Sequence, residues 1–193
     1  VDQSGNASNL VQVTEADQPQ IVVNGALYVD TNGNPGIYFD GSGQHLDFAS
    51  GVAVTDGHVF IVYKMDTTDT TQSFAGSGTG ASGTYLLLMQ DGSTTAEVYR
   101  EMSVDSDYIN GAVQSLANRN EYFDAIGAGT DAKLFGIDGL TTSENLAEIG
   151  IGGLNDTFSL KGHFSEFIIY SSDQVSNQTN IEANINSHYG LWV

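Results

Sequence analysis

The stretch FSLKGHFSEFIIYSSDQVSNQTNIEANINSHYGLWV, residues 158–193, decides the fold. Its first half contains an aromatic and β-branched run made of Phe164, Phe167, Ile169 and Tyr170. Such a run is too short to cross a bilayer and suits a strand that is buried on at least one face. We therefore predict a central strand here. Strand alternation then puts Phe164 and Glu166 on one face, with Phe167 and Ile169 on the other.

The residues after this strand change their hydrophobic period. Ile181, Ile185 and Tyr189 repeat at i, i+4 and i+8, which places them in one apolar stripe on a helix. Ser176 is a suitable N-cap residue for this helix, and Gly190 is suited to end it as the C′ residue. The sequence predicts one short amphipathic helix, after which residues 191–192 pin the chain's end back onto the fold.

Apolar runs in the rest of the chain predict further short strands with turn residues between them. The runs that we assign to strands are 21–23, 26–29, 37–39, 58–65, 84–90, 97–100, 122–126 and 133–137. The run 58–65 is apolar almost throughout, which indicates cover on both faces. Many short strands with helix only at the end predict an all-β chain. Its expected architecture is a two-sheet antiparallel β-sandwich or jelly roll with one short C-terminal helix.

Residues 32–36, Asn-Gly-Asn-Pro-Gly, predict a hairpin turn between two of these runs. Asp30, Asn32 and Asn34 have the spacing at which a calcium loop places its first ligands. The glycine and the distant glutamate of an EF-hand do not follow them, so we favour a turn over a metal site.

The composition argues against several classes of partner. Twenty-four acidic residues against five basic ones give a net charge of −19, and such a surface repels phosphate backbones and anionic headgroups. We expect no nucleic acid partner and no membrane insertion, since no apolar run approaches the roughly 20 residues that span a bilayer. The charge fits a domain that works in salty surroundings, where self-repulsion is screened, and solubility alone explains it equally well.

The length and the ends of the chain carry further expectations. Its 193 residues are enough for one sizeable β domain with its own core, so we expect a single domain over 1–193. The sequence contains no cysteine, which excludes disulfides, thiolate nucleophiles and cysteine-ligated metals. It begins at Val1 rather than at a methionine, and we expect a processed product or the C-terminal part of a longer chain.

Two stretches carry a resemblance to a known superfamily. The first is the order D-Q-S-G-N, Q-P-Q-I-V and N-G-N-P-G-I-Y-F-D-G within residues 2–41. The second is the F-x-E-x-I-I-Y strand with its I-E-x-x-x-x-x-x-Y-G-L finish. Together they resemble concanavalin A-like jelly-roll domains of the laminin G-like superfamily. The nearest subgroup is the catalytic domain of the α-L-arabinofuranosidase B family, with related domains of phage structural proteins and microbial surface proteins.

This resemblance makes a glycoside hydrolase of the arabinofuranosidase type the alternative function. A retaining enzyme needs two carboxyl groups about 5 to 5.5 Å apart. The aspartate that serves as the acid in those relatives corresponds to Leu154 here, and Asp156 is the nearest substitute. The relatives' nucleophile falls between Asp69 and Asp91, where residues 70–90 contain no Asp or Glu. We therefore expect no catalytic residues and no enzyme activity.

For several other polar residues we expect a structural role and no catalytic or metal-binding role. Glu166 lies where laminarinase-type relatives keep a carboxylate, and we expect a structural role in hydrogen bonds to loop backbone. The histidines His45, His58, His163 and His188 lack metal-ligand spacing, so we expect surface or strand-end positions. The glycine-rich segment 76–83 has neither the G-x-S-x-G elbow of a hydrolase nor the Lys-Ser/Thr ending of a phosphate loop, and we interpret it as a flexible loop.

Glycan recognition needs aromatic faces for stacking and Asp or Asn side chains for hydroxyl groups, and some sites also bind Ca²⁺ through oxygen ligands. The candidate residues are tyrosines at strand ends or beside loops: Tyr85, Tyr99, Tyr108 and Tyr122. We predict no protein metal ligands and no cofactor, with Ca²⁺ as the ion that a glycan site would take.

These expectations lead to one functional hypothesis. We expect a non-catalytic adhesion or surface-structural domain on an extracellular or virion surface, such as a capsid decoration or tail-fibre component. Its partners would be a glycan or neighbouring structural-protein subunits, including further copies in a homo-oligomer. A purely architectural domain that binds no sugar is the remaining alternative.

Overall fold

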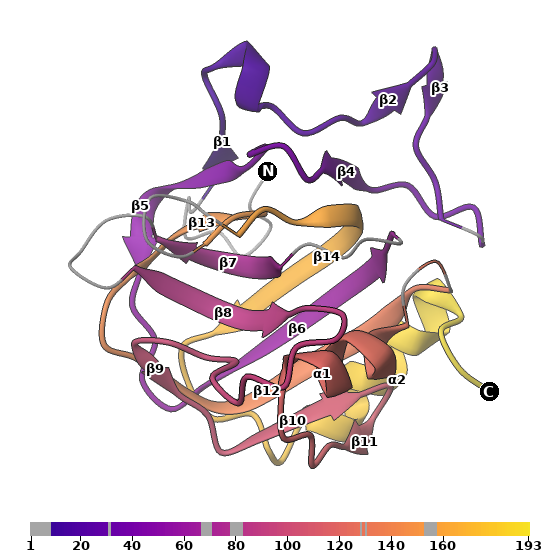
Figure 1. Cartoon of the computed structure of the whole chain (residues 1–193). Helices are drawn as coiled ribbons and strands as arrows, with labels where there is room; N and C mark the ends of the chain where they lie inside the picture. The colour runs from indigo at the N-terminus through magenta and orange to yellow at the C-terminus, as the bar shows by residue number, and fades with distance from the viewer. Residues whose placement is uncertain are drawn as a thin grey trace.

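A seven-stranded antiparallel sheet contains the longest strands. The computed structural model describes residues 9–30, 32–66, 71–77, 83–127, 129, 131–152 and 158–193. The strands lie in the order β11 (Ala112–Val113), β10 (Ser106–Ile109), β12 (Lys133–Thr142), β6 (Gly57–Met65), β14 (Lys161–Tyr170) and β4 (Ile37–Asp40), and β9 (Met102–Ser103) pairs with β12. The predicted central strand is confirmed as β14, which lies between β6 and β4 (Figure 1).

A five-stranded antiparallel sheet packs against the first. Its strands lie in the order β1 (Leu10–Val11), β5 (Leu46–Val52), β13 (Leu146–Ile149), β7 (Gln72–Ser77) and β8 (Thr84–Met89). Phe74 on β7 joins the two sheets, because its ring centroid lies 5.0 Å from that of Tyr63 on β6 and 5.7 Å from that of Phe135 on β12. The mostly β fold with antiparallel sheets is therefore confirmed, as is the burial of β6 on both faces, where only Lys64 is partly exposed.

Helix α2 (Gln178–Tyr189) covers the outer face of the larger sheet and forms a second, smaller core. Ile185 and Tyr189 are buried against Phe60 and Leu134 of the sheet, and Ile181 packs beside them. The predicted stripe and helix are therefore confirmed. Since the second core lies outside the two sheets, the helix adds a third layer to the fold (Figure 1).

The ends of α2 agree with prediction at one side only. Gly190 has φ +66° and its N–H donates to the Asn186 carbonyl at 2.7 Å, as expected of a helix-ending glycine. At the start, Ser176 is not the cap: the N-cap position is Asn177, which has helical backbone angles and makes no side-chain capping bond. Residues 175–177 form a turn that leads into the helix, so the first helical residue is later than the sequence predicted.

The run 122–126, predicted as a strand, is part of helix α1 (Arg119–Ile126). Asn118 caps this helix by accepting the Glu121 N–H at 3.1 Å, while the Glu121 carboxylate accepts the Ala117 N–H at 2.8 Å. This arrangement is similar to a capping box, except that the Glu121 carboxylate binds the N–H before the cap residue, and it fixes a helix start that hydrophobicity alone does not show. The prediction of a single helix is therefore wrong: the described residues form two α-helices, α1 and α2, and a short 3-10 helix at Glu15–Asp17.

The run 97–100 is also not a strand, although its backbone pairs locally with β8. Leu88 N–H donates to the Val98 carbonyl at 2.7 Å, and Arg100 forms an isolated bridge with Tyr85. Two hydrogen-bonded contacts do not make a continuous ladder, so this segment only covers the edge of the five-stranded sheet.

A β-bulge corrects the predicted alternation along β14. Phe164 lies opposite Tyr63, but the next register pair joins Glu166 to Val62, which inserts an extra residue between them. Phe164 and Phe167 consequently both face the main core, whereas Glu166 faces the side that carries α2. This shift brings Glu166 to the helix.

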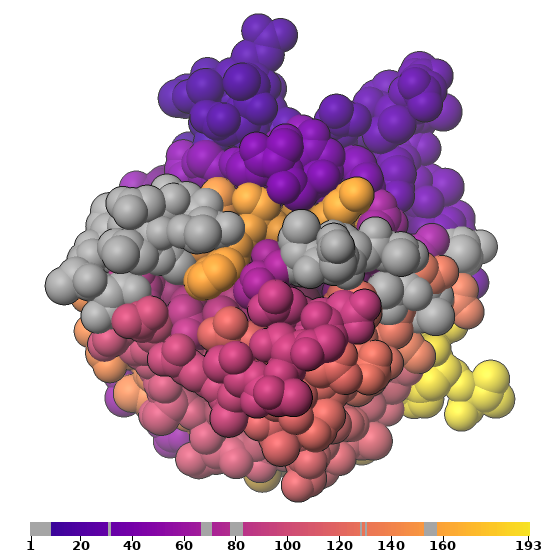
Figure 2. Space-filling model, viewed as in Figure 1, coloured from indigo at the N-terminus to yellow at the C-terminus, as the bar shows by residue number. Residues whose placement is uncertain are grey.

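A two-stranded ribbon stands apart from both sheets near the N-terminus. It consists of β2 (Val22–Val23) and β3 (Ala26–Leu27), joined by Asn24 and Gly25 at φ 53° and 81°. Figures 1 and 2 show it projecting from the molecule. Two apolar side chains of the ribbon and two beside it are 43–58% exposed: Val22 and Leu27 within it, and Ile21 and Val29 next to it.

The predicted turn at 32–36 is confirmed by its hydrogen bonds. The buried Asp30 carboxylate accepts the Asn32 N–H at 2.9 Å and the Asn34 N–H at 2.8 Å. Val29 then pairs with Pro35 across the turn. Within the described residues, neither helix is long and apolar enough to cross a membrane.

Candidate functional site

Two of the four candidate tyrosines are buried and present no ring face to solvent. Tyr85 on β8 is 1% exposed and meets Phe158 edge to face, and Tyr122 on α1 is 4% exposed. Burial raises the pKa of Tyr85 to about 12. Their expected positions beside loops are therefore corrected, because strand β8 is covered by segment 97–100 and residue 122 belongs to a packed helix.

Tyr99 and Tyr122 share one buried carboxylate. The hydroxyl groups of both donate to Asp107 Oδ2, which lies on β10 with its residue 6% exposed. Burial and the Asp107 charge raise the pKa of the Tyr99 hydroxyl well above its ordinary value. This cluster ties α1 and segment 97–100 to the larger sheet, so its evident role is structural.

Tyr108 is the candidate that lies nearest to a surface hollow. It is opposite Gly136 in the β10–β12 pair, and a Cβ placed at Gly136 would lie 3.6 Å from the Tyr108 Cβ and 3.8 Å from a Glu182 carboxyl oxygen. The partly exposed Tyr108 therefore shares the sheet face on which α2 lies.

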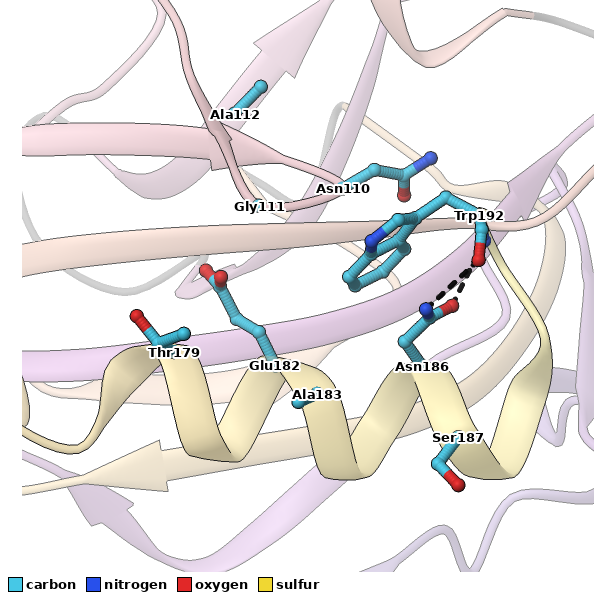
Figure 3. A pocket seen from close by; sticks show the side chains of 9 residues that line it. All are labelled: Asn110, Gly111, Ala112, Thr179, Glu182, Ala183, Asn186, Ser187 and Trp192. Carbon is cyan, nitrogen blue, oxygen red and sulfur yellow. Dashed lines mark hydrogen bonds between the residues drawn. The ribbon is translucent and has the colours of Figure 1, made fainter.

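A pocket of about 460 Å³ lies between α2 and the turn that joins β10 to β11. We name it the α2 groove; Figure 3 shows the nine residues that line it: Asn110, Gly111, Ala112, Thr179, Glu182, Ala183, Asn186, Ser187 and Trp192. One wall is a two-residue turn in which Asn110 and Gly111 have φ 50° and 76°, the signature of a type I′ hairpin. The other wall is one side of the helix.

Glu182 supplies the charged group of the α2 groove. The residue is 7% exposed, and its Oε1 accepts a hydrogen bond from Gln178 Nε2 at 2.9 Å. A Cβ placed at Gly111 would lie 3.2 Å from Oε2, so a glycine at this position leaves room for the carboxylate. In Figure 3 the carboxylate points from α2 toward the Gly111 turn, beside the indole of Trp192.

Asn186 holds Trp192 in place. Its Nδ2 donates to the Trp192 carbonyl at 3.0 Å, and its Oδ1 accepts the N–H groups of Leu191 and Trp192, each at 2.9 Å. These bonds fold the chain back along α2, as the sequence predicted for residues 191–192. They fix the tryptophan backbone before any ligand arrives, which lowers the ordering cost of binding.

A second pocket lies on the other side of the C-terminal half of α2. It has a volume of about 600 Å³ and is lined by Glu166, Asn184, Ile185, Ser187, His188 and Tyr189. Burial raises the pKa of Glu166, and the nearby His188 opposes that shift. Glu166 thus lies against the helix, and the hydrogen bond to loop backbone predicted for it stays a prediction.

Each of these pockets has one carboxyl group among the described residues that line it, Glu182 in the first and Glu166 in the second. The arrangement supplies hydrogen-bond acceptors and an aromatic surface. The positions on which the glycosidase comparison rests, Leu154, Asp156 and Asp69, lie outside the described residues.

Two of the histidines predicted at surface or strand-end positions are buried. His58 is 1% exposed, although it lies at the start of β6 as a strand-end residue. His163 is 0% exposed and is the third residue of β14, where its ring lies beside that of Tyr28. Burial lowers the pKa of His163. Although the sequence spacing of the histidines suggests no metal site, folding brings His45 and His58 close to carboxylates.

Two groups place one imidazole and two carboxylates within 4.8 Å of one another. They are His58 with Asp138 and Asp173, and His45 with Asp47 and Glu148. In the first group, His58 Nδ1 accepts the main-chain N–H of Gln174 at 3.1 Å, so a backbone donor already takes that lone pair.

Sequence reasoning missed the residues of the α2 groove, although two signals were present. Asn110-Gly111 is the dipeptide most typical of a tight hairpin. Trp192 is the sole tryptophan of the chain, and a single large amphipathic ring among polar neighbours is a common binding element. Comparison of the chain with protein-family models, curated protein sequences and solved structures found no match.

Proposed function

We propose that the protein is a non-catalytic adhesion or surface-structural domain that binds a neutral saccharide in the α2 groove. The observation that carries this proposal is the pairing of Trp192 with the nine-tenths-buried carboxylate of Glu182 in one pocket. The proposal includes a more specific fold, a concanavalin A-like jelly roll. It also includes a location on an extracellular or virion surface. The repeated crossing of the chain between two antiparallel sheets supports that fold.

The chemistry of the groove suits a sugar. A pyranose or furanose ring has an apolar C–H face, which an indole can cover, and a rim of hydroxyl groups, which a carboxylate and amides can bind. Trp192 offers the first surface, and Glu182 with Asn110 offers the second. The net charge of −19 disfavours sialylated or uronic-acid sugars, so a neutral saccharide fits better.

Binding without cleavage is supported by the carboxyl groups. Retaining glycoside hydrolysis needs a pair about 5 to 5.5 Å apart, and the inverting reaction needs a pair about 6.5 to 9.5 Å apart. The described lining of the α2 groove contains Glu182 alone, and this carboxylate is committed to Gln178 on one oxygen. Such a site can hold a ligand, but one carboxyl group does not supply both the acid and the nucleophile that hydrolysis needs.

A glycan array, probed with and without calcium, tests this function directly. A saccharide found there is then titrated while the fluorescence of Trp192 is recorded, since the chain has no other tryptophan. We expect Trp192→Ala and Glu182→Gln each to weaken binding at least about tenfold, or about 1.4 kcal/mol. Tyr28→Ala is the matched control, because this ring stacks on Tyr38 outside the groove. Binding that survives both groove variants, or a chain that binds no saccharide, would refute the proposal.

Contact with neighbouring structural subunits is the second candidate function, and the exposed ribbon favours it. Ile21, Val22 and Leu27 are each more than half exposed on β2, β3 and the residue before them. At a net charge of −19, copies of the chain repel one another at low salt and less so when salt screens them. Light scattering should then show association that rises with salt and is lost in Leu27→Ser; a monomer under all salt conditions would exclude self-assembly.

A further inference from the structure

We propose that His45, Asp47 and Glu148 form a binding site for a divalent transition-metal ion such as Zn²⁺. The site lies on the outer face of the five-stranded sheet. Asp47 on β5 pairs directly with Glu148 on β13, and the adjacent pair, Leu46 with Ile149, packs into the core. Because side chains alternate along a strand, Asp47 and Glu148 point the other way, and His45 has the same parity as Asp47.

The tautomer of His45 is fixed by two hydrogen bonds. Nδ1 lies 2.9 Å from the Gly43 carbonyl, which can only accept, so Nδ1 carries the proton. Nε2 lies 2.8 Å from Gln12 Nε2, and the Thr14 N–H bound to Gln12 Oε1 at 2.9 Å sets which end of that amide faces the ring. Gln12 therefore donates to Nε2, and His45 is a neutral imidazole whose Nε2 lone pair accepts this hydrogen bond, with Asp47 Oδ1 3.5 Å from the same nitrogen.

This is the state in which histidine binds metals. A metal-bound imidazole usually donates its other N–H to a carbonyl or carboxylate, which orients the ring and fixes the tautomer. Gly43 supplies that carbonyl here. The backbone of His45 is itself anchored, because its N–H donates to the Asp17 carbonyl at 3.0 Å.

The separations fit a bridging ion better than a direct contact. His45 Nε2 and Asp47 Oδ1 are 3.5 Å apart, which is too long for a good hydrogen bond, and with the proton on Nδ1 neither atom has a hydrogen to donate to the other. Zinc bonds of about 2.1 Å in a tetrahedron place neighbouring ligand atoms about 3.4 Å apart. The ligand atoms of all three residues lie within 4.8 Å of one another, so small side-chain rotations complete the site.

The charges on this face of the sheet also favour a bound metal ion. Like charges directly opposite each other on neighbouring strands are destabilising, and Asp47 and Glu148 are such a pair in a chain of net charge −19. An ion between them turns this repulsion into attraction. The imidazole selects the kind of ion, because nitrogen ligands suit Zn²⁺ and its neighbours, whereas Ca²⁺ and Mg²⁺ prefer oxygen ligands alone.

The position of Gln12 explains why this group is favoured over the one around His58. The donor on His45 is a side-chain amide, which can rotate away and leave the fourth position to water. The donor on His58 is the main-chain N–H of Gln174, which can leave only if the backbone moves. The His45 group therefore frees its ligand atom at the lower cost.

Zinc binding to the full chain tests the site, measured by competition with a chromophoric zinc chelator in high salt and excess Ca²⁺, which suppress non-specific binding to acidic surface. We expect one Zn²⁺ per chain. His45→Gln, Asp47→Asn and Glu148→Gln should each weaken binding at least about tenfold. His188→Gln is the matched control, because this exposed histidine lies on α2, and it should leave the affinity unchanged.

Histidine-selective NMR of the unaltered chain provides a second readout that needs no variant. Of the four histidines, His45 alone should show shifted imidazole resonances at one equivalent of Zn²⁺. Three results would overturn the proposal: no saturable zinc binding, wild-type affinity in a folded His45→Gln variant, or loss of zinc to Ca²⁺ at equal concentrations.

Discussion

Replacing Asn186 by Ala should release Trp192 from the α2 groove while leaving the rest of the fold intact. Three hydrogen bonds of 2.9–3.0 Å connect the Asn186 side chain to the backbone of Leu191 and Trp192. Each such bond contributes about 0.5–1.5 kcal/mol net, and water compensates for part of the loss at this partly exposed position. We therefore expect the docked tail to lose about 2 kcal/mol, a shift of about 30-fold in its docking equilibrium.

The assay uses the tryptophan itself. In Asn186→Ala the emission of Trp192 should move to longer wavelength and acrylamide should quench it more strongly, because the indole spends more time in water. The melting temperature should change little, since residues 190–193 lie outside both sheets and outside α2. Saccharide binding should weaken in parallel, because an undocked tail must be ordered again before a ligand can contact its ring.

Asn184→Ala is the control for this experiment. Asn184 is an exposed residue of the same helix and of the same type, and it lines the other pocket. Both variants gain the higher helix propensity of alanine, so that effect cancels in the comparison. If Asn186→Ala and Asn184→Ala give the same emission and the same quenching, the three bonds do not hold the tryptophan and our explanation of the groove is wrong.

Three further predictions concern buried polar groups. Tyr122→Phe removes a hydroxyl that donates to the buried Asp107, and urea titration should show about 1.5–3 kcal/mol less stability; no change would mean that the cluster is not structural. Tyr85 and Tyr189 have pKa values of about 12 against an ordinary 10.0, so the stability that they contribute is complete below pH 10 and is lost as pH rises through 12; urea midpoints that stay constant from pH 9.5 to 12 would contradict this. Burial raises the pKa of Glu166, so its carboxylate costs stability above the unfolded value of 4.5; Glu166→Gln should raise the melting temperature at pH 7, with a difference that shrinks below pH 4.

The parts of the fold that the sequence predicted are those where side chains alone set the structure. The apolar run within β6 and the stripe on α2 satisfy one period over many residues, and tertiary packing then agrees with local preference. Helix α1 shows the opposite case. Its run Tyr-Phe-Asp-Ala-Ile resembles a strand by composition, and the deciding signal was the capping pair Asn118 and Glu121 that precedes it.

The hairpin of β10 and β11 was missed because its turn, not its strands, carries the signal, whereas the strands of the β2–β3 hairpin were predicted. Asn24-Gly25 and Asn110-Gly111 both join strands of only two to four residues, which are too short for a hydrophobic period to be a strong signal. Both asparagines have positive φ, which the Asn-Gly dipeptide tolerates better than other pairs. Attention to these dipeptides would have located one wall of the α2 groove in advance.

The candidate sites depended on information that no local pattern contains. Glu182 meets Gly111 although it lies 71 positions later in the chain, and Asp47 meets Glu148 only because of the β5–β13 register. The bulge in β14 likewise moves Glu166 to the helix side by one inserted residue. Pairing register and bulges are decided by the whole sheet, so the predicted tyrosines were reasonable in type but wrong in place for Tyr85 and Tyr122.

The way in which Asn186 bends the last residues back along α2 has a practical consequence for laboratory work. Val193 is fully exposed and follows directly after the tryptophan that lines the groove. A purification tag, dye or surface tether attached after this residue would emerge at the rim of the groove and compete with incoming molecules for the same space. Immobilisation for binding measurements should therefore use a surface side chain remote from α2, such as an introduced cysteine at Asp91, which is exposed in the turn after β8.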